Sequence, residues 1–238
     1  MSEPKDLETL LARVTERRRE LLTSVLNRRT RHFCMVLEDL FDPHNISAVI
    51  RTAEVFGLQD VHIIEEDNAY SVNKSILKGS YKWMSLYLYK KRMLCMEKLR
   101  EKGYKIAVAS TNTTNSVLDL DLSQPMAFYL GSEFHGNHPD TLAHADYEFK
   151  LPQYGITESM NVSVAGGVLM TYLDVFMQKQ GREKFALPQA ERDALLLDWL
   201  DRHVNGIETN SPIVRVEGYS SYFSRCGQCQ SQNMLDCF

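Results

Sequence analysis

Strands and helices are expected to alternate along most of this 238-residue chain, and this alternation constrains its fold more than any other feature. Residues 33–39 are a short apolar run typical of a buried strand, and residues 61–64 are another. Between them lies a helical stripe that Gly57 ends, formed by Ile46, Val49, Ile50, Ala53 and Phe56. A strand–helix–strand unit of about thirty residues is what parallel neighbouring strands require, so the sequence predicts an α/β fold.

The same alternation continues through the middle of the chain. Further helices or strands are expected at 71–79, 85–89, 92–103, 104–109, 126–130, 141–145 and 147–151. The polar stretch 178–184 is typical of a linker. Residues 188–204 then predict a helix whose buried side carries Leu195, Leu196, Trp199 and Leu200.

The pattern fades after residue 206, and three of the five cysteines crowd into the tail: Cys226, Cys229 and Cys237. They could be part of a zinc site, but a fourth ligand is not evident nearby. We therefore expect no metal and a loosely docked or disordered tail.

Residues 151–173 pass from a proline-containing loop into a helix of small and apolar residues. Ser159 is the expected N-cap, and Asn161 competes for the same role. The paired Gly166 and Gly167 lower helix propensity, so we expect them to allow close packing against another backbone. A core helix that needs only small residues is the alternative.

The composition, with 44% hydrophobic and 24% charged residues, fits one domain with appendages. No apolar run approaches the roughly 20 residues that span a bilayer, so no membrane association is expected. The first ten residues lack the basic-then-apolar order of a signal peptide. Five cysteines form no disulfide framework in a chain of this size, which makes a reducing cytoplasm the expected compartment.

Charge is distributed unevenly. Residues 1–31 carry eight basic and five acidic residues, a net charge of +3 in a chain whose total is −4, which leaves −7 for the remainder. Apolar residues at helical spacing predict an amphipathic helix or helix pair with an arginine-rich exposed side. Because guanidinium groups suit phosphate oxygens, we interpret 1–31 as an RNA-binding arm that contacts RNA through Arg13, Arg17, Arg18 and Arg19. A solvated helix face is the alternative.

Three polar stretches stand out together: DPHNISAVIRTAEVFG at 42–57, LGSEFHGNHPD at 130–140 and SMNVSV at 159–164. In this order and spacing they resemble the three motifs of the SpoU/TrmH family of SPOUT RNA 2′-O-methyltransferases, and within it the enzymes that act on tRNA guanosine. The resemblance covers roughly residues 33–176. It implies S-adenosylmethionine as cofactor, a homodimer, and a deep C-terminal trefoil knot, which the sequence pattern itself cannot reveal.

The resemblance also implies catalytic residues. Arg51 takes the position of the family's motif-one arginine, and Asn45, Glu133, Ser159 and Asn161 complete the set. A guanidinium has a pKa above about 12, so clamping an RNA phosphate and polarising the 2′-hydroxyl suits Arg51 better than acting as general base. Asn45 and Ser159 could also cap their helices.

Three histidines lie close to these motifs. His44 is the rival base, since an unperturbed imidazole has a pKa near about 6.5, but we assign it a secondary contact with RNA. His135 and His138 are expected at the surface.

A cofactor pocket built from loop backbone would explain the glycine and serine residues of the motifs. The resemblance implies that S-adenosylmethionine contacts Ser110, Thr111, Asn112, Leu130, Gly131, Leu151, Ile156 and Met160. No Gly-x-Gly-x-x-Gly follows the first strand, so a Rossmann mode of binding is not supported.

The sequence therefore predicts a SPOUT-type parallel sheet flanked by helical extensions: 1–31 as the arm, 32–177 as the methyltransferase domain and 178–238 as extension and tail. The expected activity is methylation of a guanosine 2′-hydroxyl in the D-loop of tRNA. A ribosomal RNA substrate is one alternative, although such relatives usually carry a larger N-terminal domain. A non-catalytic RNA-binding protein is the other, and the intact motif residues argue against it.

Overall fold

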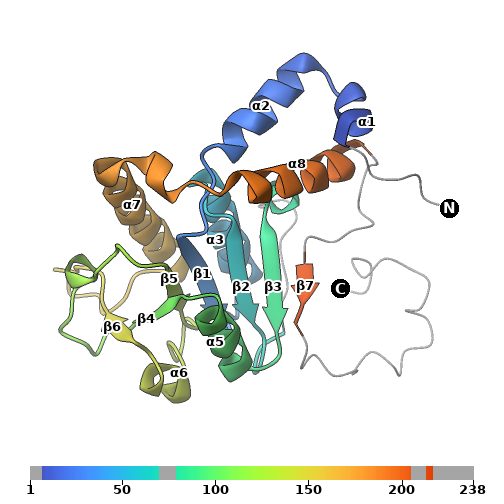
Figure 1. Cartoon of the computed structure of the whole chain (residues 1–238). Coiled ribbons are helices and arrows are strands. Elements are labelled where there is room, and N and C mark those ends of the chain that lie inside the picture. The colour runs from blue at the N-terminus through green and yellow to red at the C-terminus, as the bar shows by residue number, and fades with distance from the viewer. Residues whose placement is uncertain (1–6, 70–78, 205–212, 217–238) are drawn as a thin grey trace, which may run out of the picture.

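A seven-stranded parallel sheet forms the centre of the molecule (Figure 1). The computed structural model describes residues 7–69, 79–204 and 213–216. The strands follow the order β6-β4-β5-β1-β2-β3-β7, and every neighbouring pair is parallel. Their bounds are β1 Phe33–Glu38, β2 Asp60–Ile64, β3 Ser85–Tyr89, β4 Lys105–Ala109, β5 Met126–Leu130, β6 Tyr147–Phe149 and β7 Ile213–Arg215. The parallel α/β fold is confirmed, although β7 was not predicted.

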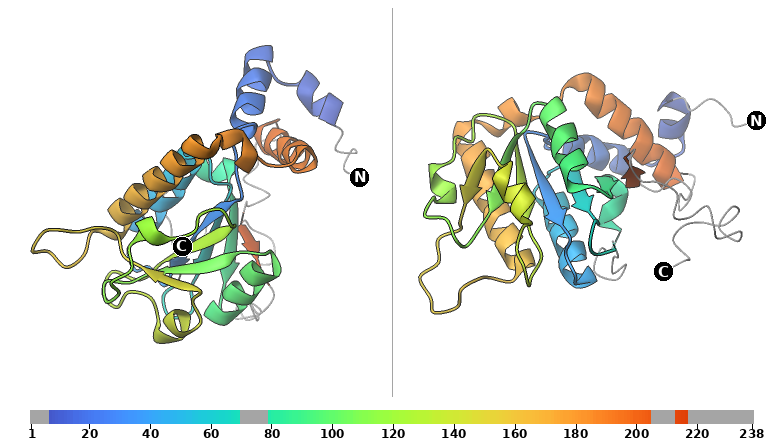
Figure 2. Two further views of the ribbon diagram at one scale, coloured as in Figure 1. Left: turned by 60° about the vertical axis from the view of Figure 1, so that its left-hand side comes forward. Right: turned by 90° about the horizontal axis from the view of Figure 1, so that it is seen from below.

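Helices cover both faces of this sheet (Figure 2). On one face α3 (Pro43–Val55) packs against α7 (Val162–Gln180), and α5 (Arg92–Glu101) lies on the other. The short helix α6 (Pro139–Ala143) precedes β6. Three 3-10 turns complete the connections: η1 Ser80–Trp83, η2 Val117–Asp119 and η3 Arg182–Phe185.

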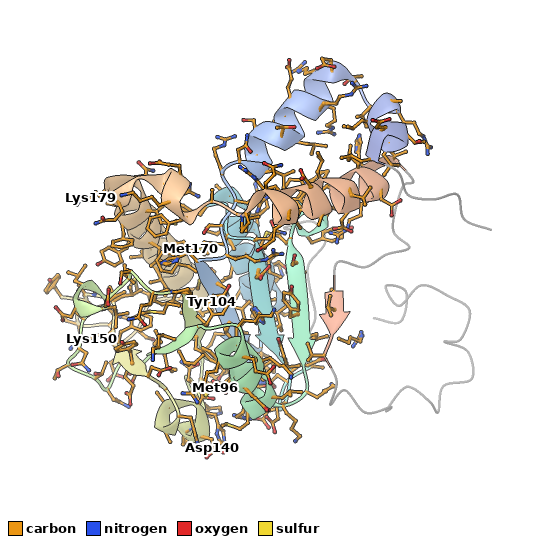
Figure 3. All side chains as sticks on the ribbon, in the orientation of Figure 1. Met96, Tyr104, Asp140, Lys150, Met170 and Lys179 are labelled. Carbon is orange, nitrogen blue, oxygen red and sulfur yellow. The ribbon has the colours of Figure 1, made fainter. Side chains whose placement is uncertain are left out.

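The sheet separates two hydrophobic cores because alternate side chains of a strand point to opposite faces. Phe33, Met35 and Leu37 of β1 join the core beneath α3 and α7, to which Met170 also belongs. Cys34 and Val36 join the core beneath α5, together with Met96. Met170 and Met96 are labelled in Figure 3.

A third hydrophobic cluster lies outside the sheet, where the N-terminal helices meet α8. The helices α1 (Leu7–Ala12) and α2 (Glu16–Leu26) pack against α8 (Gln189–Val204), and Figure 2 shows them standing away from the sheet. Leu10, Leu22, Leu26, Leu187, Leu195, Trp199 and Leu200 form the buried centre. The predicted N-terminal helix pair and the helix at 188–204 are thus confirmed.

One arginine of the predicted arm is buried and a second is partly buried. The side chain of Arg29 is 1% exposed; it donates to Glu54 Oε1 at 2.6 Å, and its guanidinium lies 5.2 Å from the ring centre of Trp199. Arg31 pairs with the buried carboxylate of Asp60 at 3.0 Å. For Arg29 the expectation of an exposed side chain is wrong, because it pairs with Glu54 inside the fold; Arg31 is only partly exposed because the buried carboxylate of Asp60 needs a cationic partner.

Two further expectations concern the region after residue 161. A Cβ atom on Gly166 would meet side chains, Leu130 at 3.3 Å and Val49 at 3.4 Å, and one on Gly167 would meet no described atom within 4 Å. The pair therefore does not mediate close packing against a backbone within the described chain. Residues 178–184 are not a linker: α7 continues to Gln180, η3 follows, and Arg182 donates to the carbonyl of Phe56 at 2.7 Å.

Residues 71–78 of the predicted segment 71–79 and the cysteines Cys226, Cys229 and Cys237 lie outside the described residues. Within the described part of the chain, no helix combines the length and apolar character needed to cross a bilayer.

A buried histidine couples folding to pH. His62 in β2 stacks on Tyr87 with ring centres 4.7 Å apart, and its Nδ1 lies 3.1 Å from the hydroxyl of Tyr89. Burial, assisted by the positive charge of Lys102, lowers the pKa of His62 to about 3. In the unfolded chain His62 is protonated below a pH of about 6.5, whereas in the folded chain it stays neutral down to a pH of about 3.

Replacing His62 with glutamine is expected to reduce acid lability. Stability from the neutral imidazole is fully present above a pH of about 6.5, and it falls by up to about 1.4 kcal/mol per pH unit as the pH drops towards 3. Urea unfolding at pH values of about 7.5 and 5 should show a smaller loss for His62→Gln than for the wild type. The exposed His144→Gln is the control. An equal loss in the wild type and His62→Gln would contradict the assignment.

Candidate active site

Three loops at the carboxyl edge of the sheet enclose a cleft of about 490 Å³. They follow β4, β5 and β6, which are neighbours in the sheet, so the loops lie side by side. The first turn of α7 contributes the remaining lining. The volume falls within the range of about 300–1,000 Å³ that small-molecule sites occupy. Seven of the eight predicted cofactor contacts line this cleft: Ser110, Thr111, Asn112, Leu130, Gly131, Leu151 and Met160.

The loop after β5 is too tight for any residue but glycine at its start. A Cβ atom on Gly131 would lie 2.1 Å from the backbone nitrogen of Asn137. Ser132 and Gly136 pair through two backbone hydrogen bonds of 3.0 and 2.9 Å, and Gly136 has a φ of +69°. Gly131 thus permits a close approach to the protein's own backbone, and this turn shapes one wall of the cleft.

Ile156 is the predicted cofactor contact that the structure places elsewhere. It lies outside the cleft lining, in the loop between β6 and α7, and its side chain is fully exposed, as is that of Tyr154. Figure 2 shows this loop extending away from the body of the molecule. A cofactor contact at Ile156 stays a prediction and requires the loop to fold back.

Hydrogen bonds join all three predicted motifs at the cleft. Asn161 Nδ2 donates to Asn45 Oδ1 at 3.1 Å, and Asn45 Nδ2 donates to Glu133 Oε1 at 2.7 Å. The second oxygen of Glu133 accepts from the backbone N–H of Phe41 at 3.1 Å. These contacts connect residues 88 and 116 positions apart in the chain. Asn45, Glu133 and Asn161 therefore form one unit, which we call the amide–carboxylate network.

The helix caps leave Asn45 available for this network. Asp42 caps α3 by accepting from the N–H of His44 at 2.8 Å, and Pro43 occupies the first turn. Asn45 is therefore not the cap that it could have been. In the third motif Asn161, not Ser159, caps α7: its Oδ1 accepts from the N–H of Ser163 at 2.9 Å. The expectation that Ser159 caps the helix is wrong, and Asn161 serves as both cap and network donor.

The other predicted catalytic and RNA-binding residues of the motifs lie around the network. Ser159 is exposed and lines the cleft. Arg51 and His44 are on α3, and both are exposed. Arg51 follows Asn45 by six residues, which places it about 9 Å further along the helix axis. As expected, His135 is exposed, whereas His138 is partly buried and caps α6.

Comparison with known proteins decides the family. Residues 32–171, more than half of the chain, match the family model described as the SpoU rRNA Methylase family. The chain belongs to the SpoU methylase family. The matched residues contain the cleft and the whole network.

Individual SpoU methylases agree with this assignment. The tRNA (guanosine(18)-2′-O)-methyltransferase of Borreliella burgdorferi is 36% identical over 187 residues, which cover 78% of this chain and 85% of the relative. The structure of the A. aeolicus TrmH/SpoU tRNA modifying enzyme aligns with a TM-score of 0.72 at 24% identity, covering 79% of this chain and 98% of that one. The SpoU methyltransferase AviRb of Streptomyces viridochromogenes, solved with the cofactor AdoMet, aligns with a TM-score of 0.58 at 19% identity over 64% and 63% of the two chains.

Asn137 is a cleft residue of this SpoU methylase that the sequence did not single out. It is 6% exposed, its Nδ2 donates to the carbonyl of Ala109 at 2.8 Å, and its Oδ1 is buried without a hydrogen-bond partner among the described residues. A buried polar atom needs a partner, so this oxygen is available to a donor bound in the cleft. With the volume and the lining loops, it makes the cleft fit S-adenosylmethionine.

A second feature that the sequence did not predict is a cluster of ion pairs around Arg92, at the carboxyl edge of the sheet. Arg92 is 6% exposed and pairs with Glu38 at 3.3 Å, Glu66 at 3.0 Å and Asp67 at 2.6 Å. Burial opposes ionisation of Glu66, yet hydrogen bonds, the first from the backbone of Arg92, lower its pKa to about 2. Glu38 also accepts from Thr141 in α6 at 2.6 Å. This cluster ties α5, β1 and α6 together beside the cleft.

Proposed function

We propose that this SpoU methylase transfers a methyl group from S-adenosylmethionine to the ribose 2′-hydroxyl of a guanosine in the D-loop of tRNA. The observation that carries the proposal is the amide–carboxylate network, which unites three motif segments of a methyltransferase family beside a cofactor-sized cleft. The relative from Borreliella burgdorferi is named for action on guanosine 18 of tRNA.

The residues divide the work of the reaction. Bound S-adenosylmethionine supplies an electrophilic methyl group, and the 2′-oxygen must lie in line with it and lose a proton. We assign orientation of the ribose to Asn45, Glu133 and Asn161, with Ser159 as a further contact. Arg51 clamps an RNA phosphate and polarises the hydroxyl, because a guanidinium provides a fixed fork of donors but resists deprotonation.

A direct assay tests the reaction class. The purified chain is incubated with methyl-labelled S-adenosylmethionine and an unmodified tRNA transcript, and the digested nucleosides are separated by mass spectrometry. We expect label in 2′-O-methylguanosine. Label on a base, or none in a preparation that binds S-adenosylmethionine by calorimetry, would contradict the proposal.

The N-terminal helices are proposed as an arm that holds the tRNA body. Arg17 in α2 is exposed and Arg18 is partly exposed. Arg19 is also partly exposed, although its Nε donates to the carbonyl of Leu11 at 2.9 Å. Arg13, after α1, is exposed as well. The local excess of positive charge in a chain of net charge −4 supports this assignment.

Replacing Arg17, Arg18 and Arg19 together with alanine is expected to weaken tRNA binding and flatten its salt dependence. Removing one arginine–phosphate ion pair should reduce the slope of log affinity against log salt by roughly 0.7 to 0.9. S-adenosylmethionine binding should not change. Glu20→Gln, on the same helix, is the control and should not weaken binding. If the triple variant kept the tRNA affinity and the salt slope of the wild type, these arginines would be a solvated helix face and not an RNA contact.

A homodimer is proposed through α7. Val164, Val168 and Val175 are 54%, 44% and 42% exposed, and Thr171 between them is also exposed. Their spacing of four, three and four residues places them on one seam of the helix, as in helix–helix interfaces. A self-complementary seam of this kind suits a two-fold dimer.

The dimer proposal predicts a change in mass. Light scattering at assay concentration should give a dimer for the wild type and a monomer for Val168→Asp, because a charge in an apolar interface has no partner. Leu21→Asp, on the exposed side of α2, is the control and should remain dimeric. A monomeric wild type would overturn the proposal.

The remaining assignments belong to the same proposal. Residues 32–177 form the methyltransferase domain, and 178–238 a C-terminal extension. A deep trefoil knot lies in this domain, supported by the path from β5 past β4 to β6 and back to α7 beside α3. A reducing cytoplasm is proposed from cysteine usage, since Cys34 and Cys95 are buried free thiols.

A further inference from the structure

Two exposed phenylalanine rings meet beside the amide–carboxylate network. Phe41 is 66% exposed and Phe134 is 76% exposed, yet their ring centres lie 6.0 Å apart at an interplanar angle of 77°. Phe134 also lines the rim of the cleft. Isolated exposed apolar residues are common in soluble proteins, but a paired aromatic surface at the rim of a site indicates a ligand contact.

The backbone on both sides holds these rings in place. The N–H of Phe41 donates to Glu133 Oε2 at 3.1 Å, and Asp42, the next residue, caps α3. Phe134 follows Glu133 directly and lies within the turn closed by the two hydrogen bonds between Ser132 and Gly136. One carboxylate therefore fixes both the ring pair and Asn45, so the rings keep a constant position relative to the network.

We propose that Phe41 and Phe134 form a stacking platform for the base of the nucleotide whose ribose is methylated. This inference rests on the proposed function and adds to it the contact that holds the base. A ribose placed at the network carries its base within one nucleoside length, and the ring pair is the exposed aromatic surface anchored there. Base recognition outside a duplex commonly uses aromatic side chains in this way.

The platform is expected to hold the base without selecting which base is bound. An aromatic face stacks on any base, and it carries no hydrogen-bond donors or acceptors that could distinguish guanine. Guanosine selection must therefore come from other groups, and the platform sets affinity and the angle at which the ribose enters. Loss of the platform should raise the KM for tRNA, with little effect on the affinity for S-adenosylmethionine.

Single substitutions test the aromatic character of the contact. Phe134→Ala and Phe41→Ala should each weaken tRNA binding by roughly 5- to 150-fold, measured with S-adenosylhomocysteine present. Phe134→Tyr should retain wild-type affinity, whereas Phe134→Leu, which keeps apolar bulk, should not. Leu118→Ala, which removes another exposed apolar side chain, is the control. Full affinity in Phe134→Leu would overturn stacking.

A double-mutant cycle identifies the occupant. Tight binding by the wild type should fall when the target nucleotide is made abasic, and Phe134→Ala should lose nothing further on that transcript. Additive losses would overturn the assignment to the target base. If Phe134→Ala lost S-adenosylmethionine affinity to the same extent, the ring would be a cofactor contact. If the variant changed mass in light scattering, the ring pair would be part of a protein–protein interface. Either result overturns the proposal.

These readouts remain separate from the proposed function. If the wild type binds tRNA but transfers no methyl group to the intact transcript, the proposed function fails, while the binding cycle still decides the platform. If methyl transfer occurs and the cycle shows no coupling, only the platform fails.

Discussion

Glu133→Ala is expected to lower methyl transfer to tRNA by about two to three orders of magnitude, the cost of removing a group that orients the reacting atoms. Its carboxylate accepts from Asn45 at 2.7 Å and from the backbone of Phe41 at 3.1 Å, so its removal breaks both hydrogen bonds between the loop after β5 and the start of α3. The affinity for S-adenosylmethionine, measured by calorimetry, should change much less. Glu97→Ala, which removes an exposed carboxylate on α5, is the control.

Glu133→Gln distinguishes the geometry of the carboxylate from its bulk. Both partners of Glu133 are N–H donors, and a carboxylate can accept from both. A glutamine amide offers one acceptor oxygen and turns a donor towards the other partner, so one of the two hydrogen bonds must break. We expect turnover between those of the wild type and Glu133→Ala. Wild-type turnover in Glu133→Ala would remove the network from the mechanism.

Arg51→Ala should also lower kcat by orders of magnitude while cofactor affinity changes little, because a contact made in the transition state affects rate more than ground-state binding. Arg51→Lys should fail as well, since an ammonium group lacks the planar fork that grips phosphate. Single-turnover rates at saturating tRNA measure the effect without interference from binding. A variant with near-normal turnover would exclude Arg51 from the reaction.

The parallel sheet could be predicted because local patterns determine it. Apolar runs such as β1 and β2 separated by a helical stripe admit few arrangements, and the residues after neighbouring parallel strands must lie together. The family resemblance implied that Ser110, Leu130 and Leu151 contact one cofactor, and because they follow neighbouring strands they do line one cleft.

Features that depend on distant partners could not be predicted. Ser159 and Asn161 are both competent caps, and the choice of Asn161 follows from its hydrogen bond to Asn45, 116 residues away. Arginines near a chain end are usually solvated, so the burial of Arg29 beside Glu54 had no local signal. The strand β7 pairs with β3, but its three residues are too few to be recognised as a strand from the sequence alone.

The central claim is that the network directs methylation to the 2′-oxygen of a D-loop guanosine in tRNA. The most direct test maps the methylated nucleotide by mass spectrometry of fragments from a tRNA transcript treated with the wild-type chain and S-adenosylmethionine. A matched transcript carries 2′-deoxyguanosine at the mapped position. The account predicts one methyl group, on a D-loop guanosine ribose, and none at that position in the deoxy transcript. Methylation outside the D-loop, or methylation that persists at the deoxy position, would contradict it.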